Sequence, residues 1–274
     1  MRRLAGVIGW PIAHSLSPPM QEAAFAALAL DWRFDAFAVE PARLAEAVAG
    51  AGALGFVGLN VTVPHKEAVL AFCDADAEAR AVGAVNTLVY STGSEGGRRP
   101  RGLNTDLHGF RMLLAEAGVD PRGARAVLLG AGGAARAVAR VLLDGGAALT
   151  VVSRSSRAIA FADRPPIAHL AWEPQPLANA LAAADLLVDA TTRGLDPGSR
   201  LDLAPLPAGA AVLDLAVRPS TPLVDEARAR GLRAATGEAM LVHQGARALE
   251  AWCGKPAPVE TMRAALAAAL RARR

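Results

Sequence analysis

A lysine and an aspartate could together transfer a proton. Lys occurs only at positions 66 and 255, and all other cations apart from His are Arg. Arg keeps its proton near neutral pH, whereas a partly buried Lys can release it. Lys66 ends the segment N-V-T-V-P-H-K, in which Asn60 and Thr62 alternate onto one face of a strand predicted over 55–63. Lys66 is therefore a candidate acid–base group.

The second candidate is Asp106, which follows Asn104 and Thr105 and opens a helix predicted to run to about residue 117. The helix dipole stabilises a carboxylate in the first turn, so a purely structural role is one reading of Asp106. The functional reading makes Asp106 the charge partner of a catalytic amine.

Two hydroxyls precede the first predicted helix, which extends to about residue 30. Ser17 stands before Pro18 and has the pattern of an N-cap. Ser15 places a second hydroxyl in the same loop, and paired hydroxyls suit a carboxylate or a polyol. The loop either caps the helix or contacts a ligand.

A glycine-rich turn predicts nucleotide binding. A buried strand over 126–129 leads directly into G-A-G-G-A-A, and a helix follows from about 133 to 143. Gly130 allows the tight turn, Gly132 lets the backbone approach a pyrophosphate, and Ala135 allows close helix–strand packing. The helix N-terminus offers free N–H groups to phosphates. The turn residues proposed for this role are Gly130, Ala131, Gly132, Gly133 and Ala134.

The next strand, over 148–152, indicates which dinucleotide is bound. An NAD site would carry an acidic residue about 20 residues after the glycine turn, to bind the ribose 2′-hydroxyl. This chain has Ser153, Arg154, Ser155 and Arg157 instead. Guanidinium groups can hold a 2′-phosphate bidentately, so the sequence favours NADP over NAD.

The elements that position these residues alternate between strand and helix. Strands at 4–9, 32–39 and 55–63 alternate with helices at 17–30, 41–49 and one beginning near Lys66. Beyond the glycine turn, strands at 148–152, 185–190, 211–215 and 233–235 and a helix at 222–230 predict a parallel, doubly wound sheet. Helices at 241–252 and 259–273 end the chain. The predicted fold class is α/β.

Composition excludes several classes of protein. The chain has 274 residues, of which 53% are hydrophobic and 20% charged, as in a globular protein with a sizeable core. No apolar run reaches the roughly 18 to 20 residues of a membrane span. The net charge of +3 is spread along the chain without a basic run, which suits a small anionic substrate and excludes a nucleic-acid partner. Two cysteines, Cys73 and Cys253, predict neither disulfides nor a metal site, and indicate a reducing cytoplasm.

Six motifs in this order resemble the shikimate dehydrogenase family, NADP-dependent enzymes of aromatic amino-acid and chorismate biosynthesis. They are S-L-S-P at 15–18, N-V-T-V-P-H-K at 60–66, A-V-N-T at 84–87, N-T-D at 104–106, G-A-G-G-A at 130–134, and Gln244. Together they span nearly the whole chain.

The resemblance implies a fold of two domains. Residues 1–103 would be an α/β substrate domain, 104–237 a Rossmann-type NADP-binding domain with a connecting helix at 104–118, and 238–274 helices returning to the substrate domain. The family comparison also implies residue roles. It implies catalysis by Lys66 and Asp106, substrate contacts from Ser15, Ser17, Asn60, Thr62, Asn86 and Gln244, and NADP contacts from Gly130, Ala131, Gly132, Gly133, Ala134, Ser153, Arg154, Ser155, Arg157, Thr191, Leu215 and Gly237.

Three positions depart from the family pattern. Asp189 replaces the usual Asn, Leu195 replaces a common Met, and Val217 replaces a Tyr whose hydroxyl normally reaches the substrate. A quinate or other polyol dehydrogenase and a non-catalytic NADP-binding homologue therefore stay as alternatives. We expect a small-molecule substrate, no membrane partner, and a homodimer as the assembly to test.

Overall fold

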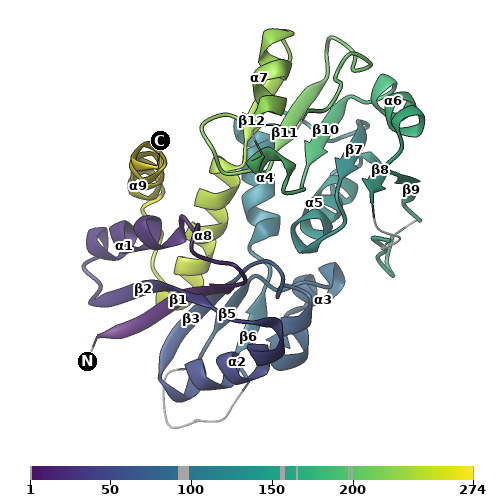
Figure 1. Cartoon of the computed structure of the whole chain (residues 1–274). Helices are drawn as coiled ribbons and strands as arrows, with labels where there is room; N and C mark the ends of the chain where they lie inside the picture. The colour runs from purple at the N-terminus through teal and green to yellow at the C-terminus, as the bar shows by residue number, and fades with distance from the viewer. Residues whose placement is uncertain are drawn as a thin grey trace. The chain divides into compact units, whose positions relative to one another are not determined.

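We describe a computed structural model of the chain that covers residues 2–91, 99–154, 158–164, 166–196, 198 and 200–273. The chain forms two compact units (Figure 1). The first consists of Met1–Gly109 and Val242–Arg274, and the second of Phe110–Leu241. The functional role of each unit stays a prediction.

The first unit contains a six-stranded sheet in the order β2-β1-β3-β5-β6-β4. Strands β1, β2 and β3 are parallel, β5 is antiparallel to both its neighbours, and β4 is parallel to β6. The bounds are β1 Arg3–Gly9, β2 Trp32–Ala38, β3 Phe56–Val61, β4 Asp74–Ala75, β5 Thr87–Val89 and β6 Arg101–Leu103.

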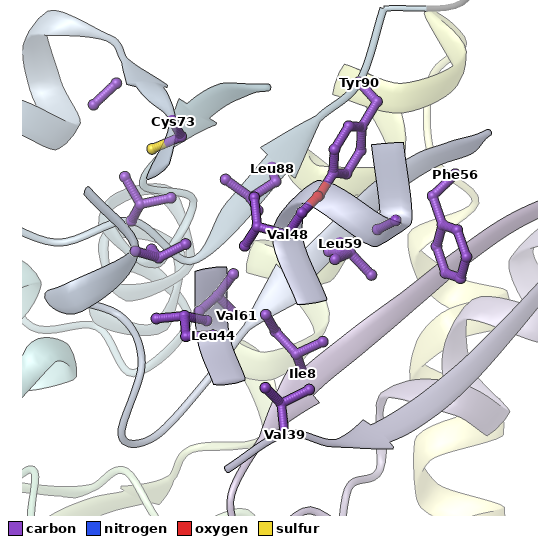
Figure 2. Packing of buried hydrophobic residues seen from close by; sticks show 14 of the residues in the cluster. Ile8, Val39, Leu44, Val48, Phe56, Leu59, Val61, Cys73, Leu88 and Tyr90 are labelled. Atoms are coloured by element: carbon purple, nitrogen blue, oxygen red, sulfur yellow. The ribbon is translucent and has the colours of Figure 1, made fainter. Parts of the chain in front are cut away.

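Helices cover both faces of this sheet. Helix α2 packs Leu44 and Val48 onto a face that carries Leu59 and Val61 (Figure 2). On the opposite face Trp252 of α8 lies over Gly58, and α9 packs on α1 (Figure 1). The helices are α1 Ser17–Ala27, α2 Leu44–Ala53, α3 Ala77–Val82, α8 Glu238–Cys253 and α9 Val259–Ala272.

The second unit contains a six-stranded, fully parallel sheet in the order β12-β11-β10-β7-β8-β9. Read from β9, this is the classic dinucleotide-binding order, which reverses between β7 and β10; ligands bind at that switch point. The doubly wound α/β prediction is confirmed. The bounds are α4 Asp106–Glu116, β7 Arg125–Leu129, α5 Gly133–Asp144, β8 Ala148–Ser153, β9 Ala168–Ala171, α6 Pro174–Ala182, β10 Leu186–Asp189, β11 Ala211–Asp214, α7 Pro222–Ala229 and β12 Arg233–Thr236.

Helices α6 and α7 line one face of the second sheet. Leu177 and Leu181 of α6 and Leu223 of α7 share a buried cluster with Val127 and Leu187 of the strands. The first four residues of α4 belong to the first unit and the rest to the second, whereas α8 begins in the second unit.

Two local predictions were wrong. No α-helix begins near Lys66, because the Lys66 carbonyl accepts the N–H of Val85 at 2.7 Å, and only a 3₁₀ turn at Ala68–Phe72 follows. Ser17 is not an N-cap but the first residue of α1, with Leu16 in the cap position. The Ser15 hydroxyl accepts the Ser17 N–H at 3.3 Å, so the neighbouring serine supplies the oxygen expected from Ser17.

Among the described residues no helix is both long and apolar enough to span a membrane.

Candidate functional site

Lys66 and Asp106 form a buried ion pair in the first unit. Nζ of Lys66 donates to Oδ2 of Asp106 at 2.5 Å, and the two side chains are 12% and 5% exposed. Lys66 follows β3, and Asp106 is the first residue of α4. A charge-assisted hydrogen bond of this length is strong, and its low exposure limits screening by salt.

Asn86 holds the other oxygen of the Asp106 carboxylate. Its Nδ2 donates to Oδ1 of Asp106 at 2.8 Å, and its Oδ1 accepts the backbone N–H of Thr105 at 2.7 Å. The turn at 104–106 is therefore tied to the start of β5 through one amide side chain.

Thr87 and Asn60 form a hydrogen-bonded chain that supports Asn86. The Thr87 hydroxyl donates to Oδ1 of Asn86 at 3.1 Å, and Asn60 Nδ2 donates to the Thr87 hydroxyl oxygen at 3.2 Å. The Asn60 position is fixed because Asn60 and Thr87 lie opposite each other in the β3–β5 ladder. Oδ1 of Asn60 is buried without a hydrogen-bond partner, so one acceptor remains open.

Helix α8 brings Gln244 to the same group. Asn86 Nδ2 lies 3.4 Å from Oε1 of Gln244, and Gln21 of α1 donates to the carbonyl of Gly245 at 2.9 Å. Ser17 lies one turn before Gln21 on α1, and both are buried, so Ser17 lies on the helix face that turns toward α8.

The structure leaves Ser15 and Thr62 outside this hydrogen-bonded group. Thr62 follows β3, and its methyl group lies against Gly9. Arg273 donates to the carbonyls of His14 and Ser15 at 2.6 and 2.9 Å and so fixes the turn before α1. His65 is 1% exposed, with its ring against the Val39 carbonyl at 2.7 Å, in keeping with a packing role.

Sequence reasoning missed three contributors to the group: Gln21, Thr87 and Thr105. The two threonines stand beside predicted residues within A-V-N-T and N-T-D, and they contribute hydroxyls to the same network. Gln21 could have been found from its helical spacing to Ser17.

The glycine turn in the second unit has the conformation that nucleotide binding requires. Gly130 has φ +103°, which favours glycine, and a Cβ there would lie 3.2 Å from Thr191, beyond the end of β10. Gly132 precedes α5 as its N-cap, and a Cβ there would meet no atom within 4 Å. The backbone is therefore open where the turn meets the start of α5, and a cofactor role for this turn stays a prediction.

Other predicted cofactor residues lie at neighbouring strand ends of this unit. A Cβ on Gly237 would stand 2.2 Å from the Leu215 carbonyl oxygen, so only glycine fits there. Ser153 ends β8, and Arg154 follows it with an exposed side chain. Ser155 and Arg157 lie outside the described residues. In the described ranges no three His, Cys, Asp or Glu residues gather as metal ligands.

Comparisons with known proteins cover both units. Residues 7–88 match the sequence family of the shikimate dehydrogenase substrate-binding domain, 118–195 match a putative NAD(P)-binding family, and 237–267 match the shikimate 5′-dehydrogenase C-terminal domain.

Whole-chain relatives give the same picture. The NADP-dependent shikimate dehydrogenase of Symbiobacterium thermophilum is 46% identical, over 98% of this chain and 95% of its own. The crystal structure of shikimate 5-dehydrogenase from Thermus thermophilus with NADP(H) and shikimate has a TM-score of 0.86 and 38% identity, over 98% of this chain and 100% of that one. A 5-ketofructose reductase of Gluconobacter has a TM-score of 0.80 and 33% identity, over 98% and 99%.

Proposed function

We propose that this chain, which belongs to the shikimate dehydrogenase family, catalyses the reversible reduction of 3-dehydroshikimate to shikimate with NADPH. The observation that carries the proposal is the buried ion pair between Lys66 and Asp106. The Asp106 carboxylate also accepts a hydrogen bond from Asn86. A solvent-exposed pair would hold neither group in one geometry.

In this proposal Lys66 and Asp106 transfer the proton. NADPH, when bound, supplies a hydride to the carbonyl carbon of the substrate. The carbonyl oxygen then gains negative charge, and the Lys66 ammonium donates the proton that completes the hydroxyl group. Asp106 orients Nζ and stabilises its charge. In the oxidative direction Lys66 takes the same proton back from the substrate hydroxyl group.

Several polar groups would bind the substrate. We assign this role to Ser15, Ser17, Asn60, Thr62, Asn86 and Gln244. The unpartnered Oδ1 of Asn60 supports it, since a buried acceptor without a donor favours a ligand that brings a hydroxyl group. The hydroxyls of shikimate are such donors.

The residues present also fit NADP. Gly130 to Ala134 would hold the pyrophosphate, because the turn is open and leads into the N-terminus of α5. Arg154, together with Ser153, Ser155 and Arg157, would hold the 2′-phosphate. Thr191, Leu215 and Gly237 would line the remainder of the site from the ends of β10, β11 and β12.

Initial rates of NADPH formation, followed by absorbance, test the function. Shikimate and quinate are each paired with NADP and with NAD, using purified protein. We expect rapid reduction only with shikimate and NADP. NADP binding without turnover of either substrate would contradict the enzymatic role.

A different substrate is the second candidate. Val217 stands in the loop after β11, where the family usually has a substrate-binding Tyr, and the Gluconobacter neighbour carries a different named activity on the same fold. A higher kcat/KM for quinate or 5-ketofructose than for the shikimate couple would decide for this candidate, and Val217→Tyr would be the variant to compare.

A homodimer and a cytoplasmic location stay predictions. Both cysteines are free, which supports a reducing compartment. Light scattering coupled to gel filtration measures the mass of the assembly, and fractionation of the source cells locates the protein.

A further inference from the structure

Two aspartates stand side by side at the ends of neighbouring strands in the second unit. Asp189 ends β10 and Asp214 ends β11, and they are partners in the parallel ladder, with Cα atoms about 4.8 Å apart. Paired positions point to the same face of a sheet. Both carboxyl groups therefore continue the apolar rows of Leu187 and Val212 beneath α7, and they are 2% and 0% exposed.

Each carboxyl group is only partly supplied with donors. Oδ1 of Asp189 accepts the Thr191 N–H at 2.8 Å and the Thr191 hydroxyl at 2.6 Å. Oδ1 of Asp214 accepts the Ala216 N–H at 3.0 Å, and the Thr221 side chain also favours its ionised form. Oδ2 of Asp214 is buried without a hydrogen-bond partner.

The surroundings can compensate one negative charge but not two. Both carboxyl groups line a cavity of 10 Å³ with Arg193, Gly194, Leu201, Pro222 and Leu223. Arg193 is the cation among these residues, yet its guanidinium lies over the Trp172 ring at 5.1 Å and donates to the Arg200 carbonyl. The first turn of α7, capped by Thr221, adds a partial positive charge.

The neighbouring glycine closes the site from the remaining side. A Cβ on Gly194 would lie 2.5 Å from Oδ2 of Asp214, so the loop packs directly on this carboxyl group. A void of about 10 Å³ is at the lower limit for a single water molecule. Bulk water therefore does not solvate the second charge.

We propose that Asp189 and Asp214 hold one proton between them, which Asp189 donates to the unpartnered Oδ2 of Asp214. The pair then carries a single negative charge, and Oδ2 of Asp214 gains a hydrogen-bond partner. Asp189 is a positioning residue: through its two bonds from Thr191 it fixes the start of the loop that runs to Leu195. Its effect on NADP rests on the proposed role of Thr191 as a cofactor contact.

The shared proton has a definite effect on stability against pH. Burial raises the pKa of both Asp189 and Asp214, and repulsion from Asp214 adds to the rise for Asp189. The hydrogen bonds to each carboxyl group and the charge of Arg193 lower both pKa values but do not cancel the rise. A raised pKa means that the folded chain binds more protons than the unfolded chain above about pH 4. Stability from this pair is therefore full at pH 4 and is lost as pH rises through the folded pKa.

Thermal unfolding of the full chain without NADP, from pH 4 to pH 9, tests the proton directly. Asp189→Asn and Asp214→Asn each supply a permanent N–H donor to the other carboxylate. We expect the Tm of the wild type to fall as pH rises, and the Tm of either variant to stay constant. The gap should widen by on the order of 3 °C for each unit by which the pKa is raised.

Asp185→Asn is the matched control, at the residue that directly precedes β10. Asp185 is half exposed, and hydrogen bonds from Arg125 lower its pKa to about 2. Its contribution is present above about pH 4 and falls only as pH drops toward 2, so Asp185→Asn should not flatten the loss at high pH.

Carbon NMR of aspartate-labelled wild-type protein supplies a second measurement. A carboxyl resonance that titrates above the usual range of an aspartate, and disappears in Asp189→Asn, supports the shared proton. Parallel Tm profiles for the wild type and both variants, or two carboxyl groups that both titrate in the usual range of an aspartate, overturn it.

NADP affinity against pH tests the link to the loop. We expect the wild type to lose NADP affinity several-fold as pH rises through the raised pKa of the pair, while the affinity of Asp189→Asn stays constant. The contrary outcome is an NADP affinity that depends on pH equally in the wild type and in Asp189→Asn, while the Tm profiles differ as expected. That result overturns only the coupling through Thr191, and the shared proton stands.

Discussion

Asn86 Nδ2 donates to Oδ1 of Asp106 at 2.8 Å, while Lys66 Nζ donates to Oδ2 of the same carboxylate at 2.5 Å. The carboxylate therefore cannot rotate without breaking one of the two bonds. Asn86 is itself fixed by Thr105 N–H and the Thr87 hydroxyl. The lysine amine is thus oriented through a chain of hydrogen bonds that begins in the β5 strand, and each link can be tested separately.

Lys66→Ala should lower kcat by about 10² to 10⁴, because general acid–base catalysis contributes this much. The variant also leaves the Asp106 carboxylate buried without its charge partner, so Tm should fall as well. NADP affinity, measured by fluorescence titration, should be unchanged if the protein stays folded. Lys255→Ala removes the chain's other lysine, which is exposed, and should alter neither value. A folded Lys66→Ala enzyme with normal kcat would exclude Lys66 from proton transfer.

Asn86→Ala should lower kcat with shikimate by about 10- to 100-fold. The Asp106 carboxylate loses a donor, and the Thr105 N–H loses its acceptor, each worth about 1–3 kcal/mol in a buried site. Steady-state kinetics and Tm are the measurements. Asn179→Ala, which removes an exposed Asn that accepts a hydrogen bond from Gln175 on α6, serves as the control. Unchanged kcat in Asn86→Ala would show that Asp106 needs no support.

Arg154→Ala should weaken NADP binding by about 10- to 100-fold and leave NAD binding unchanged. A hydrogen bond from a charged group contributes about 1.5–3 kcal/mol, and only NADP carries the 2′-phosphate. Dissociation constants for both nucleotides provide the comparison. Arg122→Ala removes an exposed arginine that precedes β7, whereas Arg154 follows the parallel strand β8. Arg122 therefore lies near the opposite ends of the strands, and this change should affect neither nucleotide. An equal loss for NADP and NAD would contradict the assignment of Arg154.

Gly58→Ala should destabilise the chain by about 1–3 kcal/mol, as overpacking of a close-packed core does. An added Cβ would stand 1.9 Å from Nε1 of Trp252, which donates to the Leu88 carbonyl at 3.0 Å. Gly50→Ala is the control: Gly50 lies within α2 with no atom in reach of a Cβ, so this change should stabilise by about 0.5–1 kcal/mol. Urea unfolding measures the change in the free energy of unfolding for both variants. Equal changes would contradict the packing argument.

Much of the fold follows from local signals in the sequence. The continuous apolar run at 126–129 with its glycine turn predicts β7 and α5, and both are confirmed. By contrast, β9 and α6 were missed, because Ala168–Ala171 is mostly exposed and α6 is a nine-residue helix that buries only Leu177 and Leu181. A short edge strand draws its stability from its neighbour, and nothing in its own residues specifies it.

The candidate site shows the same division. Lys66, Asp106 and Asn86 were each singled out in the sequence, and the structure brings them into direct contact. The arrangement among them was beyond local reasoning. No helix forms at Lys66, because its carbonyl accepts the N–H of Val85, a residue 19 positions away. The periodicity of the sequence does not predict such a long-range contact. The roles assigned to the three residues stay predictions.

The contact between Trp252 and Gly58 has a consequence for protein synthesis. The sheet face that carries Gly58 belongs to a unit whose last segment, residues 242–274, is translated after the whole second unit. This segment includes most of α8 and all of α9. On the ribosome that face stays uncovered until residues 242–274 emerge, while the second unit is continuous and can fold as soon as residue 241 is free. The second unit can therefore complete its fold first, while the strands of the first unit keep apolar surface exposed until residues 242–274 have been synthesised.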